Sequence, residues 1–151
     1  FSSLFLTCTL VLVPFSIINT SRVLELIKQF KIEVTTLSTS CFNLYCQQQK
    51  EIFDELKIVI FGGSIPPRST VETILDMNTK CTFYNYYGPS EGTYSFSGCR
   101  VERKSYNNGN LSIGRPLHPG YFYIVDSNMN LLPRGIPGEL IIGGPGISTK
   151  G

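Results

Sequence analysis

The sequence of 151 residues lacks several features that identify common classes of protein. Its formal net charge is only +2 and its basic residues are scattered, so we expect neither a nucleic acid nor a membrane surface as a partner. Its five cysteines are an odd number without a Cys-x-x-Cys pair, which predicts neither a zinc knuckle nor a disulfide framework. The only histidine, His118, has no partner nearby in the sequence, and we expect it at the surface.

The chain also lacks a segment that predicts a membrane span or a secretory signal. Residues 1–15 are strongly apolar, but they are too short to span a bilayer and have no basic start or initial Met. With 42% hydrophobic and 16% charged residues and no repeat, the composition is typical of a globular protein, and we expect a cytoplasmic one. Because the chain begins at Phe1 and ends in a glycine-rich stretch, we expect a fragment.

Up to about residue 104, the sequence alternates strand and helix patterns. Short β-branched, apolar or aromatic runs predict strands at residues 8–13, 32–37, 57–61 and 81–86. Helices are expected from Thr20 or Ser21, from about Ser40 and after Pro66-Pro67. The apolar stripe of the first helix, at i, i+3, i+4 and i+7, consists of Val23, Leu26, Ile27 and Phe30. This alternation predicts an α/β fold with a mostly parallel sheet and helices on both faces.

From residue 105 to residue 151 the pattern changes. Asn107–Asn110 is a turn cluster, and strands are expected at residues 121–125 and 138–142 with another turn between them. No helical period is visible in this part. We therefore predict a small antiparallel, barrel-like β portion of the same core domain.

The segment from Tyr84 to Thr93 combines the groups that a nucleotide site needs. It offers aromatic rings for a base, the Ser90 hydroxyl for a phosphate oxygen and the Glu91 carboxylate for a metal ion. The alternative is a tyrosine-rich strand that ends in an ordinary surface turn. A second glycine-rich loop, Gly62-Gly63-Ser64, follows the preceding strand. Because ligands collect at the carboxyl ends of parallel strands, we expect both loops at one rim.

Four motifs together resemble the adenylate-forming superfamily of AMP-dependent ligases, most of all the amino-acid adenylation domains of nonribosomal peptide synthetases. Asn85-Tyr86-Tyr87-Gly88-Pro89-Ser90-Glu91 resembles N-x-Y-G-P-T-E, and residues 138–146, Gly-Glu-Leu-Ile-Ile-Gly-Gly-Pro-Gly, resemble G-E-L-x-I-x-G-x-G. Between them, Ile113-Gly114-Arg115-Pro116 and Tyr123-Ile124-Val125-Asp126 also fit. Their order and spacing extend the resemblance over essentially the whole chain.

The resemblance implies that the full-length protein activates a carboxylic acid, in this branch an amino acid, as an acyl-adenylate with MgATP. It places Tyr87 against adenine, Asn85 at the exocyclic amine, and the Gly62–Ser64 backbone on the other side of the base. It makes Ser90 and Glu91 catalytic, with Glu91 as the magnesium ligand. The implied nucleotide-binding residues are Gly62, Gly63, Ser64, Asn85, Tyr86, Tyr87, Gly88 and Ser90. Alternatively, the tyrosines pack within the sheet and Glu91 caps a helix.

The resemblance also implies a pocket for the acid. Its residues would be Thr36, Ile60, Gly62, Tyr86, Tyr94 and Ser95. A bulky Tyr86 would shrink this pocket and favour a small side chain, unless its ring turns outward. The alternative is that Thr36 and Ile60 are ordinary core residues of strands.

Three hypotheses for the function stay open. The first is a piece of an amino-acid adenylation domain, with a phosphopantetheine carrier-protein domain as partner. The second is an acyl-CoA or aryl-CoA ligase with coenzyme A as acceptor, and the third is an inactive fragment that serves only as an interaction or inert segment. Residues 1–151 contain neither the phosphate loop ending in Lys nor the distal catalytic Lys of the superfamily, so we expect negligible adenylation by these residues alone.

Overall fold

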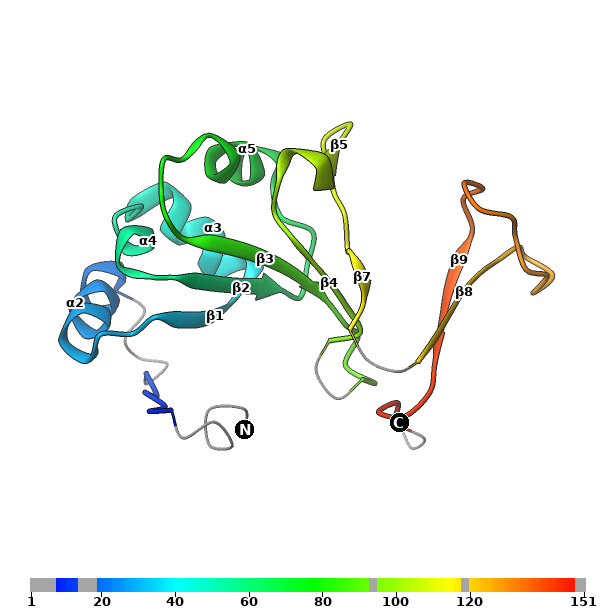
Figure 1. Ribbon diagram of the computed structural model, residues 1–151, viewed down its shortest axis with the longest axis horizontal. Coiled ribbons are helices and arrows are strands. Elements are labelled where there is room, and N and C mark those ends of the chain that lie inside the picture. Colours follow the sequence, from blue (N-terminus) through cyan, green and yellow to red (C-terminus); the bar gives the residue numbers. More distant parts are fainter. Residues whose placement is uncertain (1–7, 14–18, 93–94, 118–119, 149–151) are drawn as a thin grey trace.

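The computed structural model describes residues 8–13, 19–92, 95–117 and 120–148, and it confirms the α/β class (Figure 1). Its first part contains α2 (Thr20–Phe30), β1 (Val34–Ser38), α3 (Thr39–Gln48), α4 (Ile52–Glu55), β2 (Ile58–Gly62), α5 (Arg68–Asp76) and β3 (Thr82–Tyr87). Its second part contains β4 (Ser97–Arg100), the 3₁₀ helix Arg103–Ser105, β5 (Tyr106–Asn107), β6 (Asn110–Leu111), β7 (Arg115–Pro116), β8 (Tyr121–Val125) and β9 (Glu139–Gly143).

A five-stranded sheet forms the centre of the protein, in the order β1-β2-β3-β4-β7. β1, β2 and β3 run parallel, as the alternation of strands and helices predicts, and β4 and β7 continue the sheet in antiparallel fashion. The register places Gly62 at the end of β2 opposite Tyr86 near the end of β3. The carboxyl ends of these two strands therefore lie side by side.

The core of the protein is a cluster of four phenylalanines between the helices and one face of the sheet. Phe42 of α3 stacks on Phe61 of β2 with ring centroids 4.1 Å apart, and its ring also contacts Phe53 of α4 and Phe83 of β3. Ile27 of α2 and Ile74 of α5 join the same buried cluster. Burial of several large aromatic side chains supplies the main driving force for folding this part of the chain.

The helices α2, α3, α4 and α5 all contribute to this one cluster, so they pack on a single face of the sheet, whereas the sequence predicts helices on both faces. The opposite face carries Thr36, Ile60, Tyr84 and Tyr86, which lie in register on β1, β2 and β3. These residues are half-buried or exposed. The sequence pattern could not separate the two faces, because both faces of β2 are apolar. Ile58 and Ile60 lie on one face, and Val59 and Phe61 lie on the other.

The N-terminal part of the chain differs from the sequence prediction in three details. Residues 8–13 form no strand, because an apolar, β-branched run becomes a strand only where a neighbouring strand pairs with it. Asn19 caps α2 in place of the predicted Thr20 or Ser21, and its side chain accepts hydrogen bonds from the backbone N–H groups of Ser21 and Arg22. Phe30, predicted to be buried, is 49% exposed at the last turn of α2.

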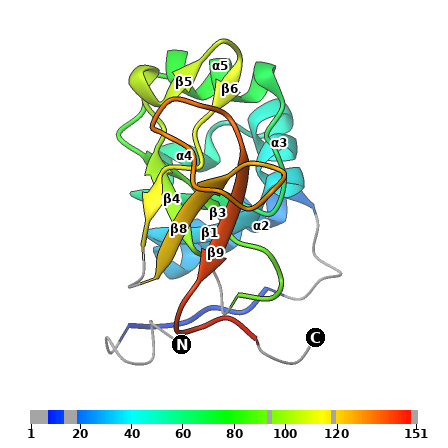
Figure 2. The same cartoon turned by 90° about the vertical axis from the view of Figure 1, so that its right-hand side faces the viewer.

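The second part of the chain is antiparallel, as predicted. The turn Asn108-Gly109, with φ angles of 50° and 82°, closes the β5–β6 hairpin in the left-handed geometry that Asn-Gly favours. β8 and β9 form a separate two-stranded ribbon that stands away from the main sheet (Figures 1 and 2). These described residues therefore form open ribbons in place of a closed barrel, and the division of the chain after residue 104 stays a prediction.

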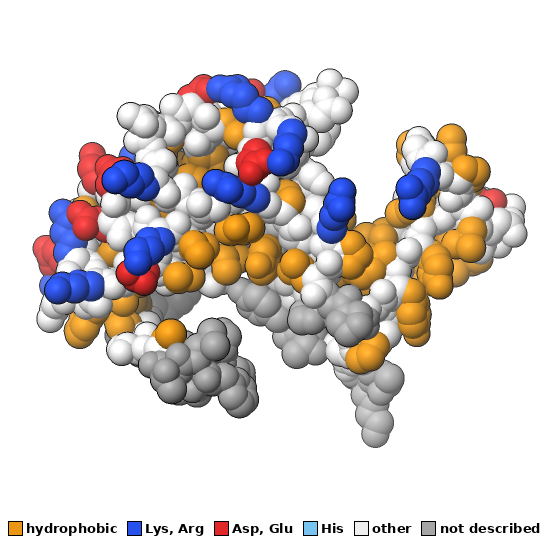
Figure 3. All heavy atoms as spheres, viewed as in Figure 1, with side chains coloured by type: hydrophobic (Ala, Val, Ile, Leu, Met, Phe, Trp, Pro, Cys, Tyr) orange, Lys and Arg blue, Asp and Glu red, His pale blue; other side chains and the backbone are white. Residues whose placement is uncertain are grey.

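Charged and apolar side chains lie in different regions of the surface. Figure 3 shows basic and acidic side chains over the helical part, and a band of hydrophobic side chains below the sheet and along the β8–β9 ribbon. On the ribbon the exposed apolar residues include Tyr121, Tyr123 and Ile124. Within the described ranges, no helix combines the length and apolar character needed to cross a bilayer.

We predict that Phe42→Ala lowers the free energy of unfolding of the chain by about 3–5 kcal/mol, because it removes the ring at the centre of the aromatic cluster and leaves a cavity. Chemical denaturation measures this loss. Phe30→Ala is the matched control, since that ring is 49% exposed, and its effect should stay below about 1 kcal/mol. Equal losses for the two variants would contradict the assignment of the core.

Candidate functional site

Two glycine-rich loops meet at the rim formed by the carboxyl ends of β2 and β3. Because Gly62, the last residue of β2, pairs with Tyr86, the loop that starts at Gly63 leaves the sheet beside the carboxyl end of β3. A side chain on Gly62 would collide with the carbonyl oxygen of Tyr86, so this close approach of the strands requires glycine. Gly63 has a φ of 98°, and a Cβ on it would meet no atom within 4 Å. The backbone of this loop is therefore open to a ligand.

The loop after β2 is tied to the end of β1 by a buried threonine. The hydroxyl of Thr39, the first residue of α3, donates a hydrogen bond of 3.0 Å to the carbonyl oxygen of Ser64. Thr39 is only 3% exposed. The sequence analysis did not identify this residue, because its partner is 25 positions away and no local pattern joins a helix start to a distant loop.

The turn that contains Ser90 and Glu91 is joined to the residues that directly follow the motif at residues 138–146. The backbone N–H of Ser148 donates to the carbonyl oxygen of Glu91 at 2.7 Å, and Gly92 forms an antiparallel bridge with Ile147. The first motif therefore contacts the residues that directly follow the second, although more than 50 positions separate Glu91 from Ser148. The side chains of Ser90 and Glu91 are exposed at this junction.

Successive residues of β3 face opposite sides of the sheet. Asn85 points to the helical side, is 5% exposed, and donates from Nδ2 to the carbonyl oxygen of Ser112 at 2.9 Å. The thiol of Cys99 donates to the same carbonyl at 3.0 Å. Burial raises the pKa of Cys99, which keeps this thiol protonated as a donor. Tyr87, two residues after Asn85, is 36% exposed at the rim.

The predicted acid-pocket residues lie mainly on the other face. Thr36 pairs with Ile60 in the β1–β2 register, and Gly62 pairs with Tyr86 in the next one. These four residues form a contiguous strip across β1, β2 and β3. Ser95 is buried just before β4, next to Phe96, whose N–H donates to the carbonyl oxygen of Tyr87 at 2.8 Å. Tyr94 lies outside the described residues.

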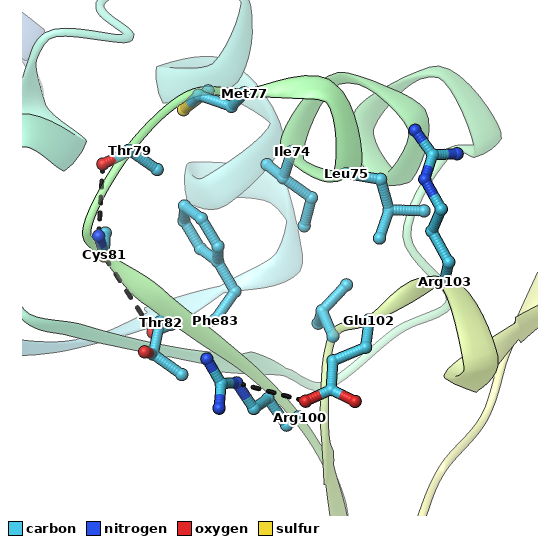
Figure 4. Close-up of a pocket in the computed structure, with 11 residues that line it drawn as sticks. Ile74, Leu75, Met77, Thr79, Cys81, Thr82, Phe83, Arg100, Glu102 and Arg103 are labelled. Carbon is cyan, nitrogen blue, oxygen red and sulfur yellow. Dashed lines mark hydrogen bonds and ion pairs between the residues drawn. The ribbon is translucent and has the colours of Figure 1, made fainter.

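A cavity of about 200 Å³ lies at the opposite end of β3 (Figure 4). Its floor is apolar and includes Ile74 and Phe83, and an ion pair of 3.4 Å between Arg100 and Glu102 lies at its edge. None of the predicted site residues lines it. The cavity is therefore separate from the rim at which the two loops meet.

Glu91 is the residue at the junction with Ser148 whose side chain could serve as a magnesium ligand. Its side chain is exposed, and the hydrogen bond from Ser148 holds its backbone carbonyl. In the part of the chain that the structure describes, no group of three or more His, Cys, Asp or Glu residues could form a complete metal site. One carboxylate suffices for Mg²⁺ at sites where substrate phosphates and water supply the other ligands.

Comparison with protein-family models gives a match to the family described as AMP-binding enzyme, over residues 1–150. Gramicidin S synthase 2 of Brevibacillus brevis is 30% identical over 132 residues, which cover 87% of this chain and 3% of that protein. Surfactin synthase subunit 3 of Bacillus subtilis is 30% identical over 133 residues, which cover 88% of this chain and 10% of that protein. Aldehyde reductase lnaA of Aspergillus flavus is 29% identical over 141 residues, which cover 93% of this chain and 14% of that protein.

Solved structures share the fold. PA1221, an NRPS protein containing adenylation and PCP domains, superposes with a TM-score of 0.78 at 20% identity, over 85% of this chain and 26% of that chain. The N-terminal subdomain of Klebsiella oxytoca NpsA in complex with 3-hydroxybenzoyl-AMSN superposes with a TM-score of 0.76 at 17% identity. The match covers 94% of this chain and 34% of that chain. This chain thus spans a small part of the length of the relatives it matches.

We predict that Thr39→Val speeds amide hydrogen exchange at Gly63 and Ser64, because the loop loses the hydroxyl that holds it. The stability cost should be about 1 kcal/mol, since the carbonyl of exposed Ser64 can bond to water instead. Thr39→Ser, which retains the donor, is the control and should exchange like the wild type. Unchanged exchange in Thr39→Val would show that this hydrogen bond does not hold the loop.

Proposed function

This chain belongs to the AMP-binding enzyme family, and we propose that the longer protein of which it forms part is a ligase that activates a carboxylic acid with ATP. The observation that carries the proposal is the β2–β3 register, because it pairs Gly62 with Tyr86 and so starts the loops after β2 and β3 at one rim. The contact between Glu91 and Ser148 supports it, since it adds a carboxylate and a hydroxyl-bearing turn at the same end of β3.

In the proposed reaction an oxygen of the carboxylate attacks the α-phosphorus of ATP. The bond between that phosphorus and the oxygen bridging to the β-phosphorus breaks, so that pyrophosphate leaves and an acyl-adenylate remains. The task of the protein is to hold two anions in line and to stabilise the charge that develops. The described residues can contribute to binding, alignment and charge stabilisation without forming a covalent bond to the substrate.

The adenine would lie between the open backbone of the Gly63–Ser64 loop and the ring of Tyr87. An aromatic ring that is 36% exposed at a rim offers a face for stacking. Asn85 uses its amide NH₂ for the carbonyl of Ser112, which leaves the amide oxygen as the group that accepts a hydrogen bond from an exocyclic amine. Gly88 directly follows Tyr87 and, having no side chain, keeps the backbone beside the ring accessible.

Ser90 and Glu91 would act at the phosphates. The exposed hydroxyl of Ser90 can donate to an α-phosphate oxygen, and Glu91 would bind magnesium, which neutralises phosphate charge when it is present. Because Ser148 fixes the backbone of Glu91 at 2.7 Å, the carboxylate starts from a defined position. This anchoring lowers the conformational entropy that metal binding would otherwise cost.

The acid would bind on the face that carries Thr36, Ile60, Gly62 and Tyr86, with Tyr94 and Ser95 at its edge. The relatives named as gramicidin S and surfactin synthases favour an amino acid. The adenylation–PCP architecture of PA1221 favours a phosphopantetheine carrier protein over coenzyme A as acceptor. We also propose a cytoplasmic location, where ATP is available and where free thiols such as Cys46 and Cys81 remain reduced.

We predict that the full-length protein catalyses acid-dependent exchange of labelled pyrophosphate into ATP, assayed with the proteinogenic amino acids, a benzoate and a fatty acid. An amino acid should give the highest rate. Residues 1–151 alone should give no exchange above background, because they contain neither the phosphate loop ending in Lys nor the distal catalytic Lys of the superfamily. The proposal fails if none of these acids supports exchange by the full-length protein.

We predict that Glu91→Gln in the full-length protein raises the magnesium concentration for half-maximal exchange about tenfold or more, because an amide oxygen is a weaker ligand than a carboxylate. The fold should persist, since the side chain is exposed. Glu25→Gln, an exposed carboxylate on α2, is the matched control and should leave the magnesium titration unchanged. Identical titrations for Glu91→Gln and the wild type would rule out the ligand role.

A further inference from the structure

The ring of Tyr86 lies over Gly98 on the neighbouring strand. The two residues form a cross-strand pair between β3 and β4. A Cβ on Gly98 would be 2.6 Å from Cδ1 and 2.7 Å from Cε1 of the ring, well inside van der Waals contact. One side of the ring therefore occupies the volume that a side chain of residue 98 would fill.

The backbone conformation at residue 98 does not require glycine. The positive φ angles of glycines in the described residues belong to other positions, including Gly63 and Gly114, and not to Gly98. Glycine within a strand weakens it and commonly marks a place where another group approaches closely. Here the approaching group is the ring of Tyr86, so the absence of a side chain at residue 98 has a steric function.

The alternative position for the Tyr86 ring is over β2, the strand on the other side of β3. There Gly62 of β2 pairs with Tyr86 and carries no side chain that would exclude the ring. On the β4 side, Cδ1 of Leu117 would be 3.3 Å from a Cβ of residue 98, so a displaced ring finds no further room in that direction. A methyl group on Gly98 would consequently push the ring towards Gly62 and Ile60.

We propose that Gly98 is a positioning residue that sets the size of the acid pocket through Tyr86. This inference rests on the proposed function, because it assigns the strip over Ile60 and Gly62 to the side chain of the acid. With Gly98 the ring lies over β4 and the strip stays open. The pocket then admits a larger side chain than the bulk of Tyr86 alone suggests.

The test uses four forms of the full-length protein: wild type, Gly98→Ala, Tyr86→Ala and the double variant. Pyrophosphate exchange is measured with amino acids from glycine to phenylalanine and with varied ATP. Gly98→Ala should raise the KM for the largest accepted acid about tenfold or more, while the KM for glycine or alanine and the KM for ATP change less than about twofold. In the Tyr86→Ala background, Gly98→Ala should have no effect, because the methyl group then meets no ring.

The outcomes separate this inference from the proposed function. Wild-type protein without acid-dependent exchange would overturn the proposed function, and the inference with it. Active wild type with an effect of Gly98→Ala that persists without the Tyr86 ring, or that raises the KM for ATP equally, would overturn the inference alone. If Gly98→Ala does not fold, the double variant should recover folding in a thermal unfolding assay, and its failure to do so would contradict the proposed contact.

Discussion

The register between β2 and β3 is the constraint on which the rest of the site depends. It pairs Gly62 with Tyr86, and a shift by one residue would exchange the two faces of a strand. The observed register turns Asn85 towards the helices and Tyr86 towards the open face, and it brings the ends of β2 and β3 together at one rim. One pairing thus defines both the proposed nucleotide rim and the proposed acid pocket.

The aromatic core fixes this register from the opposite side of the sheet. Phe61 and Phe83 pack with Phe42 beneath the helices, so the alternate residues Ile60 and Tyr84 have to face away. Burial of these rings opposes any slip, because a slip would expose them to water and place Ile60 or Tyr84 in a space shaped for phenylalanine. Stability and the proposed function therefore depend on the same alternation of residues.

The sequence predicts those elements whose signals are local. The parallel strands, the Asn108-Gly109 turn and both glycine-rich loops follow from periodicity and turn chemistry. The face covered by helices does not, since both sides of β2 are apolar. Likewise, residues 8–13 resemble a strand but have no pairing partner among the described strands. Thr39, Ser148 and Gly98 matter through neighbours distant in sequence, which no local pattern reveals.

The central claim is that the loops after β2 and β3 bind one nucleotide together. Hydrogen exchange of the full-length protein with and without AMP tests it most directly. The account predicts that AMP slows exchange at the amides of Gly63 and Ser64 and also at those of Gly88, Ser90 and Glu91, while Asn108 and Gly109 are unaffected. Protection of only one loop, or protection confined to the cavity between α5 and β4, would contradict it.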